Sequence, residues 1–313
     1  MGSLLITVSQ VLILALEIGT GYVLAKRGKI SADAVGILNY LCSNLALPCA
    51  IFLSAAGLEL TADSWGEVRL GVALIIASAI VQIGVSTRLF RKERFEERVV
   101  YQLGTVYGNS AFMGIPIATA VIGDEAVLYV VLLMIIDTVC LFIHSSLAAS
   151  GQKPTARMIA AKVFGPVTIS LLLGLAVCLL RIPLPGIINT GLNDFRGILT
   201  PLAMLIIGAQ LAEQDLLHIC REKLFYKVAG VKLVVWPAIL LRCFLPLRGV
   251  VSLAAVGAIM ICKGTPQAAI LGVLAKRHGL DGEKAAGLLG LTTVLSVVTL
   301  PVITGVTLVV FGG

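Results

Sequence analysis

The chain has 313 residues, of which 58% are hydrophobic and only 13% are charged, and its mean hydropathy is +1.02. Soluble domains are about 45–50% apolar and about 25% charged, so this composition excludes an ordinary globular enzyme, a nucleic-acid-binding protein and a disordered chain. The 24 Lys and Arg exceed the 17 Asp and Glu, which leaves a net charge of +7. The basic residues stand in short clusters between apolar runs, and this distribution is typical of a polytopic membrane protein.

Ten apolar runs are long enough to cross a bilayer, since a membrane helix needs about 20 mostly apolar residues. In chain order, we expect membrane helices at 3–25, 34–57, 67–90, 98–122, 125–149, 160–181, 187–211, 224–247, 250–276 and 284–311. No basic segment precedes the first run, which favours a membrane span there over a cleaved signal peptide. The connecting links are short, and this predicts an all-α membrane protein that forms a single helical unit.

Basic residues gather in the links that follow the odd-numbered runs. Those links hold 17 of them, namely Lys26, Arg27, Lys29, Arg88, Arg91, Lys92, Arg94, Arg98, Lys153, Arg157, Lys162, Arg221, Lys223, Lys227, Lys276, Arg277 and Lys284. The other links and the termini hold five, namely Arg69, Arg181, Arg196, Arg242 and Arg248. Because basic loops of membrane proteins stay in the cytoplasm, we expect a multi-pass protein of the cell membrane with both termini outside.

The second half of the chain repeats features of the first half. The pairs are Gly114-Ile115-Pro116 with Gly264-Thr265-Pro266 at an offset of 150, and Leu38-Asn39 and Pro48 with Leu192-Asn193 and Pro201 at offsets of 154 and 153. Each half then holds five spans, and this odd number inserts the second half upside down. We therefore expect a first five-helix repeat at 1–149, a short cytoplasmic loop at 150–158 and a second, inverted repeat at 159–313, as in many secondary transporters.

Two Gly-x-Pro motifs predict interrupted helices in the fourth and ninth spans. Pro116 and Pro266 each remove a backbone donor near the middle of a span, and Gly114 and Gly264 allow the unusual dihedral angles of a break. Interrupted backbone inside a bilayer must lie against protein or a water-filled cavity. Inverted repeats would let helices 4 and 9 cross at the midplane, with half-helices beginning at the two prolines. Their N-termini would then favour an anion; the alternative is two kinks that only bend helices.

The segment Asn109-Ser110-Ala111-Phe112-Met113-Gly114-Ile115-Pro116, followed by Gly123, resembles the fourth-helix motif of the auxin efflux carrier family, which includes the plant PIN-FORMED auxin transporters. Pro266-Gln267 followed by Ala275-Lys276 is similar to the ninth helix of that family. The resemblance spans essentially the whole chain. It implies ten helices, with helices 4 and 9 crossing in a transport domain that moves against a scaffold, and a homodimer. Plant members export indole-3-acetate, and bacterial members are linked to dicarboxylates such as malate or malonate.

The sequence also departs from the plant pattern. Val167 follows the proline of the sixth helix where plant members have Asn, although Thr168 is present. The third span holds only Gln82 as a strongly polar residue, where plant members carry charges. A short segment, 150–157, replaces the long cytoplasmic loop of many plant carriers. These differences argue against recognition of indole-acetate and against phosphorylation control in that loop.

The interrupted segments and the polar residues inside the spans define a candidate substrate site. We predict that it comprises Asn109, Ser110, Gly114, Ile115, Pro116, Thr168, Lys263, Gly264, Pro266 and Gln267. Three of them have an alternative role to substrate contact. Asn109 could instead fasten the broken backbone, Lys263 could neutralise an acidic neighbour, and Gln267 could cap the new half-helix.

Two acidic residues deep in the spans are candidates for proton coupling. Charged groups inside a membrane are costly and usually face an interior or a pathway. Asp137 lies about as deep in the fifth span as Lys263 in the ninth, so it can take up and release a proton or pair with that lysine. Glu17 in the first span is the second candidate, with a structural hydrogen bond as its alternative. His144 lies nearer the cytoplasmic end of its span, where a satisfied or snorkelling side chain is favoured over a proton relay.

These features together predict a secondary active transporter of a small organic anion, working by alternating access and driven by protons. No nucleotide-binding loop, protease motif or paired Cys/His spacing occurs, so we expect no enzyme, metal site or cofactor. The expected partners are the anion, membrane lipid, the coupling proton and a second copy of the chain, without nucleic acid. One alternative is a sodium-coupled carrier, because Asn, Thr and Gln near the breaks can ligate a hard cation. The other is a membrane sensor of the same fold that moves no solute.

Overall fold

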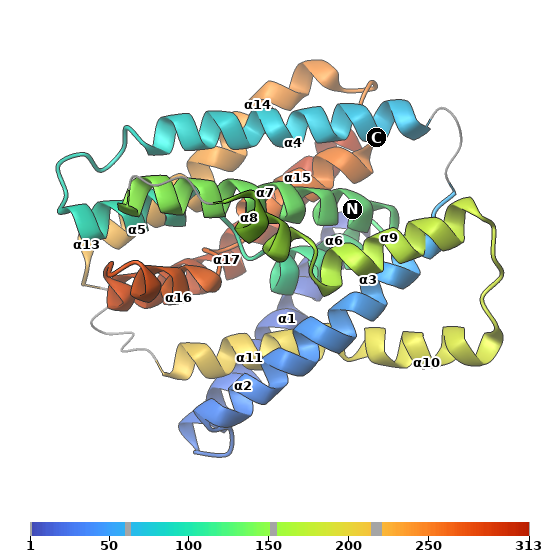
Figure 1. Cartoon of the computed structure of the whole chain (residues 1–313), viewed down its shortest axis with the longest axis horizontal. Helices are drawn as coiled ribbons and strands as arrows, with labels where there is room; N and C mark the ends of the chain where they lie inside the picture. The colour runs from blue at the N-terminus through green and yellow to red at the C-terminus, as the bar shows by residue number, and fades with distance from the viewer. Residues whose placement is uncertain (1, 60–63, 151–154, 214–220, 313) are drawn as a thin grey trace.

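The computed structural model describes residues 2–59, 64–150, 155–213 and 221–312, and these residues are helical almost throughout (Figure 1). In chain order the helices are α1 (Gly2–Lys26), α2 (Ala32–Leu41), α3 (Leu47–Ala56), α4 (Ser64–Ser86), α5 (Phe95–Val106), α6 (Ile115–Val121), α7 (Glu125–Ser150), α8 (Ala156–Val163), α9 (Pro166–Leu179), α10 (Gly186–Gly197), α11 (Leu199–Ala212), α13 (Lys223–Gly230), α14 (Trp236–Phe244), α15 (Leu253–Gly264), α16 (Ile270–Arg277) and α17 (Gly282–Phe311). Three π-helical turns lie between or before these helices. Cys42–Ala46 joins α2 to α3, Ser110–Gly114 directly precedes α6, and Val231–Val235 joins α13 to α14.

Six helical stretches among the described residues are long and apolar enough to cross a membrane. They are Ala32–Ala56, Ser64–Ser86, Glu125–Ala149, Gly186–Ala212, Lys223–Leu247 and Gly282–Phe311. Shorter apolar helices cover Ser110–Val121, Pro166–Leu179 and Leu253–Gly264. Each of these stretches falls on a different predicted run, and α1 occupies the run 3–25. The structure therefore agrees with an all-α membrane protein, while ten spans and two inverted repeats stay predictions.

Two of the predicted runs end differently in the structure. The run 160–181 is divided, because α8 ends at Val163 and α9 begins only at Pro166. Proline suits the first turn of a helix, where its missing N–H leaves no bond unmade. The run 67–90 stops at Ser86, and turns follow up to Arg94. Phe90 in these turns has a positive φ of 58°, a conformation that no helix continues through.

The π-helical turns have one local cause. Each directly precedes a helix whose second residue is proline, namely Pro48, Pro116 or Pro237. Proline has no N–H and its ring clashes with the carbonyl group four residues earlier. Widening the preceding turn by one residue removes this clash without breaking the helix. These three prolines therefore bend helices, and none of them ends one.

Several helices begin with a side chain that accepts a hydrogen bond from the backbone. Ser31, Thr155, Ser252 and Asp281 each accept the backbone N–H of the residue three positions later. Such caps satisfy one of the orphan donors in the first turn of a helix. They place the starts of α2, α8, α15 and α17.

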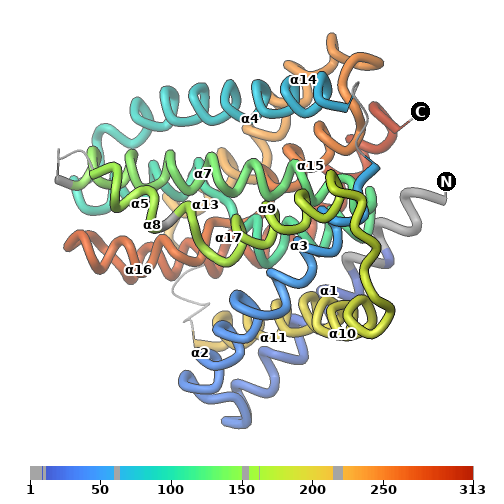
Figure 2. Tube along the Cα trace, turned by 45° about the vertical axis from the view of Figure 1, so that its right-hand side comes forward, coloured from blue at the N-terminus to red at the C-terminus, as the bar shows by residue number. Residues whose placement is uncertain are grey.

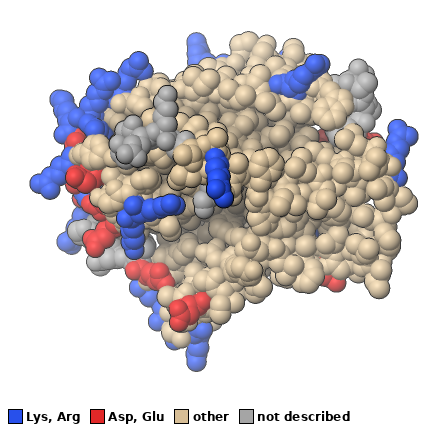
Figure 3. Space-filling view, viewed as in Figure 1, with Lys and Arg blue, Asp and Glu red and all other residues tan. Residues whose placement is uncertain are grey.

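The buried apolar side chains of the described residues form two clusters. The larger cluster joins α3, α6, α7, α11 and α15, and the smaller cluster joins α5, α13, α16 and the first half of α17. Helices α1, α2 and α11 lie together, and α4 and α14 lie on the opposite side of the molecule (Figures 1 and 2). Lys and Arg gather at the left and lower ends of this view (Figure 3), where α5, α13, α16 and the start of α2 lie. A few further Lys and Arg side chains lie at the top and right of the same view.

Helices α1 and α11 approach so closely that glycine is required where they touch. A Cβ atom on Gly208 would lie 2.0 Å from the carbonyl oxygen of Ile18, and one on Gly21 would lie 2.3 Å from that of Leu205. Small residues let membrane helices pack backbone against backbone. This pair therefore depends on the absence of two side chains.

We predict that Gly208→Ala weakens the packing of α1 on α11. The added methyl group meets backbone, which cannot move aside, and overpacking of this kind costs about 1–3 kcal/mol. The midpoint of thermal unfolding in detergent should therefore fall. Gly191→Ala in α10 is the matched control, because no atom lies within 4 Å of its new Cβ. Equal midpoints for the two variants would contradict this packing.

Candidate functional site

Two interrupted helical segments meet in the centre of the molecule. The first interruption is Tyr107–Asn109, between α5 and the turn that opens α6, and the second is residues 265–269, between α15 and α16. The N–H of Asn109 donates to the carbonyl oxygen of Pro266 at 2.9 Å, and the N–H of Ala268 donates to that of Tyr107 at 3.1 Å. Gly108 and Gln267 thus form an antiparallel bridge. The two segments meet in the structure, and each break supplies partners for the backbone of the other.

The position of the first break corrects the prediction. It lies at residues 107–109 and not at Pro116, which is the second residue of α6 after a widened turn. Gly114 and Ile115 therefore belong to a continuous helix from Ser110 to Val121. The second break agrees better with the prediction, because Pro266 lies inside it, but the new half-helix begins at Ile270.

Glycines on the crossing segments serve close packing. A Cβ on Gly114 would lie 2.9 Å from the Cys262 sulfur, and one on Gly264 would lie 2.9 Å from Ile303. The sequence analysis missed the tightest position, Gly108, where a Cβ would lie 2.3 Å from Thr265 Oγ1 and 2.6 Å from the Cys262 carbonyl oxygen. A Tyr-Gly-Asn sequence inside an apolar run was the signal that could have found it.

A cavity of about 580 Å³ opens beside the crossing. The beginnings of three helical segments line it: Ser110 after the first break, Ile270 after the second, and Pro166 of α9. The first N–H groups of a helix have no partner within that helix and carry partial positive charge. The cavity therefore offers an environment suited to a small anion.

The cavity contains some of the predicted site residues and not others. Asn109, Ser110, Asp137 and Thr168 line it, together with Ser43, Asn44 and Thr138, which the sequence analysis did not select. The residues that do not line it are Gly114, Ile115, Pro116, Lys263, Gly264, Pro266, Gln267 and Glu17.

Gln267 is turned away from the cavity. Its side-chain Nε2 donates to the carbonyl oxygen of Ala285 at 2.8 Å, and its backbone N–H donates to Thr292 Oγ1 at 3.2 Å. Both partners belong to α17, and Gln267 is completely buried. These bonds attach the second break to α17, and the start of α16 has no side-chain cap, so Gln267 does not cap the new half-helix as the alternative from the sequence proposed.

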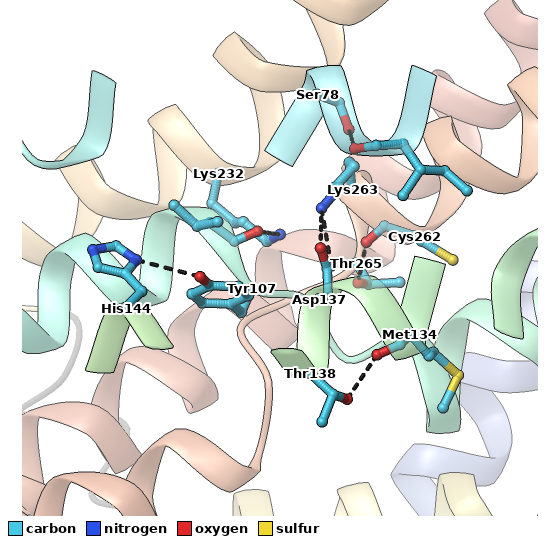
Figure 4. A network of polar contacts seen from close by, with 12 residues as sticks. Ser78, Tyr107, Met134, Asp137, Thr138, His144, Lys232, Cys262, Lys263 and Thr265 are labelled. Atoms are coloured by element: carbon cyan, nitrogen blue, oxygen red, sulfur yellow. Dashed lines mark hydrogen bonds and ion pairs between the residues drawn. The ribbon is translucent and has the colours of Figure 1, made fainter. Parts of the chain in front are cut away.

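Asp137 and Lys263 form a buried ion pair next to the cavity (Figure 4). Lys263 Nζ, from α15, lies 2.8 Å from Asp137 Oδ1 and 2.9 Å from Oδ2, from α7. The lysine is completely buried, and the carboxylate reaches the cavity wall. Lys263 thus neutralises its acidic neighbour, which is one of the alternatives that the sequence left open, and acts on the cavity through Asp137.

A second buried lysine, Lys232, was missed by the sequence analysis. It is completely buried in the π-helical turn Val231–Val235, and its Nζ donates to the carbonyl oxygen of Val106 at 3.2 Å (Figure 4). Val106 ends α5 at the first break, where helix carbonyl groups lose their partners. A cation there complements the negative end of the helix dipole. The depth of Lys232 inside the apolar run 224–247 was the available signal.

Tyr107 and His144 form the third polar contact of this region. Tyr107 Oη lies 3.3 Å from His144 Nδ1, and the two rings are tilted at 58° (Figure 4). His144 is buried and bonded through Nδ1, whereas its Nε2 has no hydrogen-bond partner among the described residues, so the satisfied side chain favoured from the sequence is present only in part. Tyr107 also lines the cavity, so this contact borders the candidate site.

Glu17 lies on α1, which packs against α11 and α17. Its Oε2 atom is buried and has no hydrogen-bond partner among the described residues. The structure does not bring this carboxylate to the cavity. Within the described parts of the chain, no group of three or more His, Cys, Asp or Glu side chains is arranged to hold a metal ion.

Comparisons with a protein family and with individual proteins all point to membrane transporters. The family described as "Membrane transport protein" matches residues 6–157 and 143–304, and the chain belongs to this family. It is therefore a multi-pass membrane transporter rather than an enzyme. A protein of Rhizobium meliloti (strain 1021) named "Putative malonate transporter" is 27% identical over 290 residues, which is 89% of each chain. An "Uncharacterized transporter" of Methanothermobacter thermautotrophicus is 26% identical over 305 residues, 94% of this chain and 95% of the other.

We predict that the Asp137–Lys263 pair obeys the energetics of a buried ion pair. Lys263→Met leaves the carboxylate without its partner and should destabilise the protein by about 3–5 kcal/mol. Adding Asp137→Leu removes the uncompensated charge, so the double variant should regain much of the lost stability. Thermal unfolding in detergent measures both effects, with Lys223→Met, at an exposed position that starts α13, as the control. A double variant no more stable than the single one would contradict the pairing.

Proposed function

We propose that this protein is a secondary active transporter of a small organic anion, with malonate and related mono- and dicarboxylates as the first candidates. The observation that carries the proposal is the cavity at the helix crossing, where three helix starts and the polar side chains of Asn109, Ser110 and Thr168 meet. The name of the Rhizobium relative supports the choice of malonate as a first substrate to test.

The cavity wall supplies the donors that a carboxylate needs. Backbone N–H groups of the half-helices donate to its oxygens, and the Asn109 amide and the Ser110 and Thr168 hydroxyls add directed hydrogen bonds. The cavity is large enough for a short dicarboxylate with bound water. Its mixed wall, with Leu47, Phe112 and Ile135 beside the polar groups, suits a ligand that has carbon between its charged ends.

Proton coupling follows in this proposal from the position of Asp137 between the cavity and Lys263. When Asp137 is protonated, the pair carries the unbalanced charge of the lysine and attracts an anion into the cavity. When the anion leaves and the proton is released, the pair becomes neutral again. Each ligand thus raises the affinity for the other by the same factor. Glu17 lies outside the cavity, so the coupling proposed here rests on Asp137 alone.

Alternating access in this proposal uses the two halves of the chain as inverted repeats, 1–149 and 159–313, with the basic links inside and both termini outside. The crossing segments move as one unit because their backbones are bonded together. A second copy of the chain is expected to complete the assembly as a homodimer.

We predict that Asn109→Ala lowers the kcat/KM for malonate uptake by about tenfold or more, since a hydrogen bond to a charged group is worth about 1.5–3 kcal/mol. The crossing bond of Asn109 uses its backbone N–H, so the substitution leaves that bond in place. Uptake of labelled malonate, malate and indole acetate into proteoliposomes measures the effect. Asn193→Ala is the control, because this side chain bonds only within α10.

The same assay on the wild type tests the sensor alternative. Malonate binding without uptake would favour a sensor over a transporter.

We predict that Asp137→Asn uncouples transport from the pH gradient. Uptake driven by an imposed gradient should fall to the rate without a gradient, while exchange of internal for external substrate continues. Parallel reactions with a sodium gradient test the sodium-coupled alternative, which predicts stimulation by sodium in the wild type. Retained dependence on the pH gradient in the variant would remove Asp137 from the coupling mechanism.

A further inference from the structure

A second cavity, of about 760 Å³, lies between α4, α5 and α7. It is separate from the candidate substrate cavity and shares no lining residue with it. Its wall is largely apolar, with Ile83, Ile143 and Leu147 among its residues. Leu147 is 42% exposed, and Ile76 and Ile80 of α4 are also exposed, so these helices present an apolar surface on the outside of the bundle.

Two arginines give this cavity a cationic rim. Arg91 comes from the turns after α4 and Arg98 from the first turn of α5, and both line the cavity. Gln102 holds the rim in shape, because its Nε2 donates to the carbonyl oxygens of Thr87 and Leu89 at 3.3 and 3.1 Å. Arginine binds phosphate oxygens through paired donors. Basic pockets between membrane helices are suited to phosphate-bearing lipid headgroups.

His144 is an independent observation that points to a ligand. It lines this cavity and is only 6% exposed, and its Nε2 atom has no hydrogen-bond partner among the described residues. Its Nδ1 atom faces the hydroxyl group of Tyr107. If that hydroxyl donates to Nδ1, the neutral ring carries its proton on Nε2 and donates into the cavity. A buried polar nitrogen without a partner is rare enough to require an explanation.

We propose that this cavity binds one anionic phospholipid. Its phosphate lies between Arg91 and Arg98, one acyl chain follows Ile83, Ile143 and Leu147, and an ester oxygen accepts a hydrogen bond from His144 Nε2. The combination of a cationic rim, an apolar wall open at the side of the bundle and one buried donor matches a lipid better than a soluble anion, which would leave the apolar wall uncovered.

Titration of the purified full-length protein in detergent with dioleoyl phosphatidylglycerol, followed by native mass spectrometry, tests this site. We expect the double variant Arg91→Gln/Arg98→Gln to bind this lipid at least tenfold more weakly. Lys92→Gln/Arg94→Gln is the matched control, because it removes the same charge from the same loop at positions that do not line the cavity. Its affinity should stay within twofold of the wild type.

His144→Phe tests the buried donor and should weaken lipid binding several-fold, since the ring keeps its volume but loses both nitrogens. Glycerol phosphate in the millimolar range and dioleoyl phosphatidylcholine should both fail to displace the bound lipid. Equal losses in the two double variants would show only general attraction to charge and would overturn the proposal. Displacement by glycerol phosphate would mark a site for a soluble phosphate and would also overturn it. Both outcomes are independent of whether malonate is transported.

Discussion

The backbone bonds between the two interrupted segments are the constraint on which the rest of this structure depends. Each break leaves N–H and C=O groups without helical partners, in a region where no bulk water satisfies them. The bonds from Asn109 to Pro266 and from Ala268 to Tyr107 solve this problem for both breaks at once. They require a backbone approach so close that Gly108 cannot carry a side chain. The same approach directs helix starts into one cavity, so the feature that stabilises the crossing also creates the candidate site.

Three charged side chains are buried around this crossing, and each has a defined partner. Asp137 and Lys263 satisfy one another, whereas Lys232 is bonded to a backbone carbonyl group at the end of α5. Together they carry one net positive charge when all three are ionised, next to a cavity that is already rich in N–H groups. Removing these charges from water costs free energy, and their bonding partners and the nearby polar cavity lower this cost. An anion in the cavity would complete this balance.

Proline has different effects on helices within this one chain, and the effect at each position depends on the surrounding tertiary structure. Pro116 and Pro237 follow widened turns that keep their helices continuous, Pro301 lies inside α17, and Pro266 lies in a true break. Where a proline interrupts helical bonding, the backbone can be accommodated by a wider turn, or the carbonyl groups left without helical donors can be bonded by a partner on another segment. In the second break a partner is present, because the Pro266 carbonyl group accepts a bond from the first break. The local motif Gly-x-Pro is the same in both halves, and only its surroundings distinguish the outcomes.

The sequence by itself determined where the helices lie, which end of the molecule is basic, and which polar residues stand deep in apolar runs. These are local properties, because the hydropathy of a segment and the missing backbone N–H of a proline have the same effect whatever the segment packs against. Asn109, Asp137 and Lys263 could be selected for this reason. The tertiary structure alone decided that Lys263 faces Asp137, that Gln267 turns to α17, that the first break lies at residues 107–109, and that Lys232 meets the end of α5. Each of these depends on a partner far along the chain, and no pattern within one segment specifies which group of another segment it will meet.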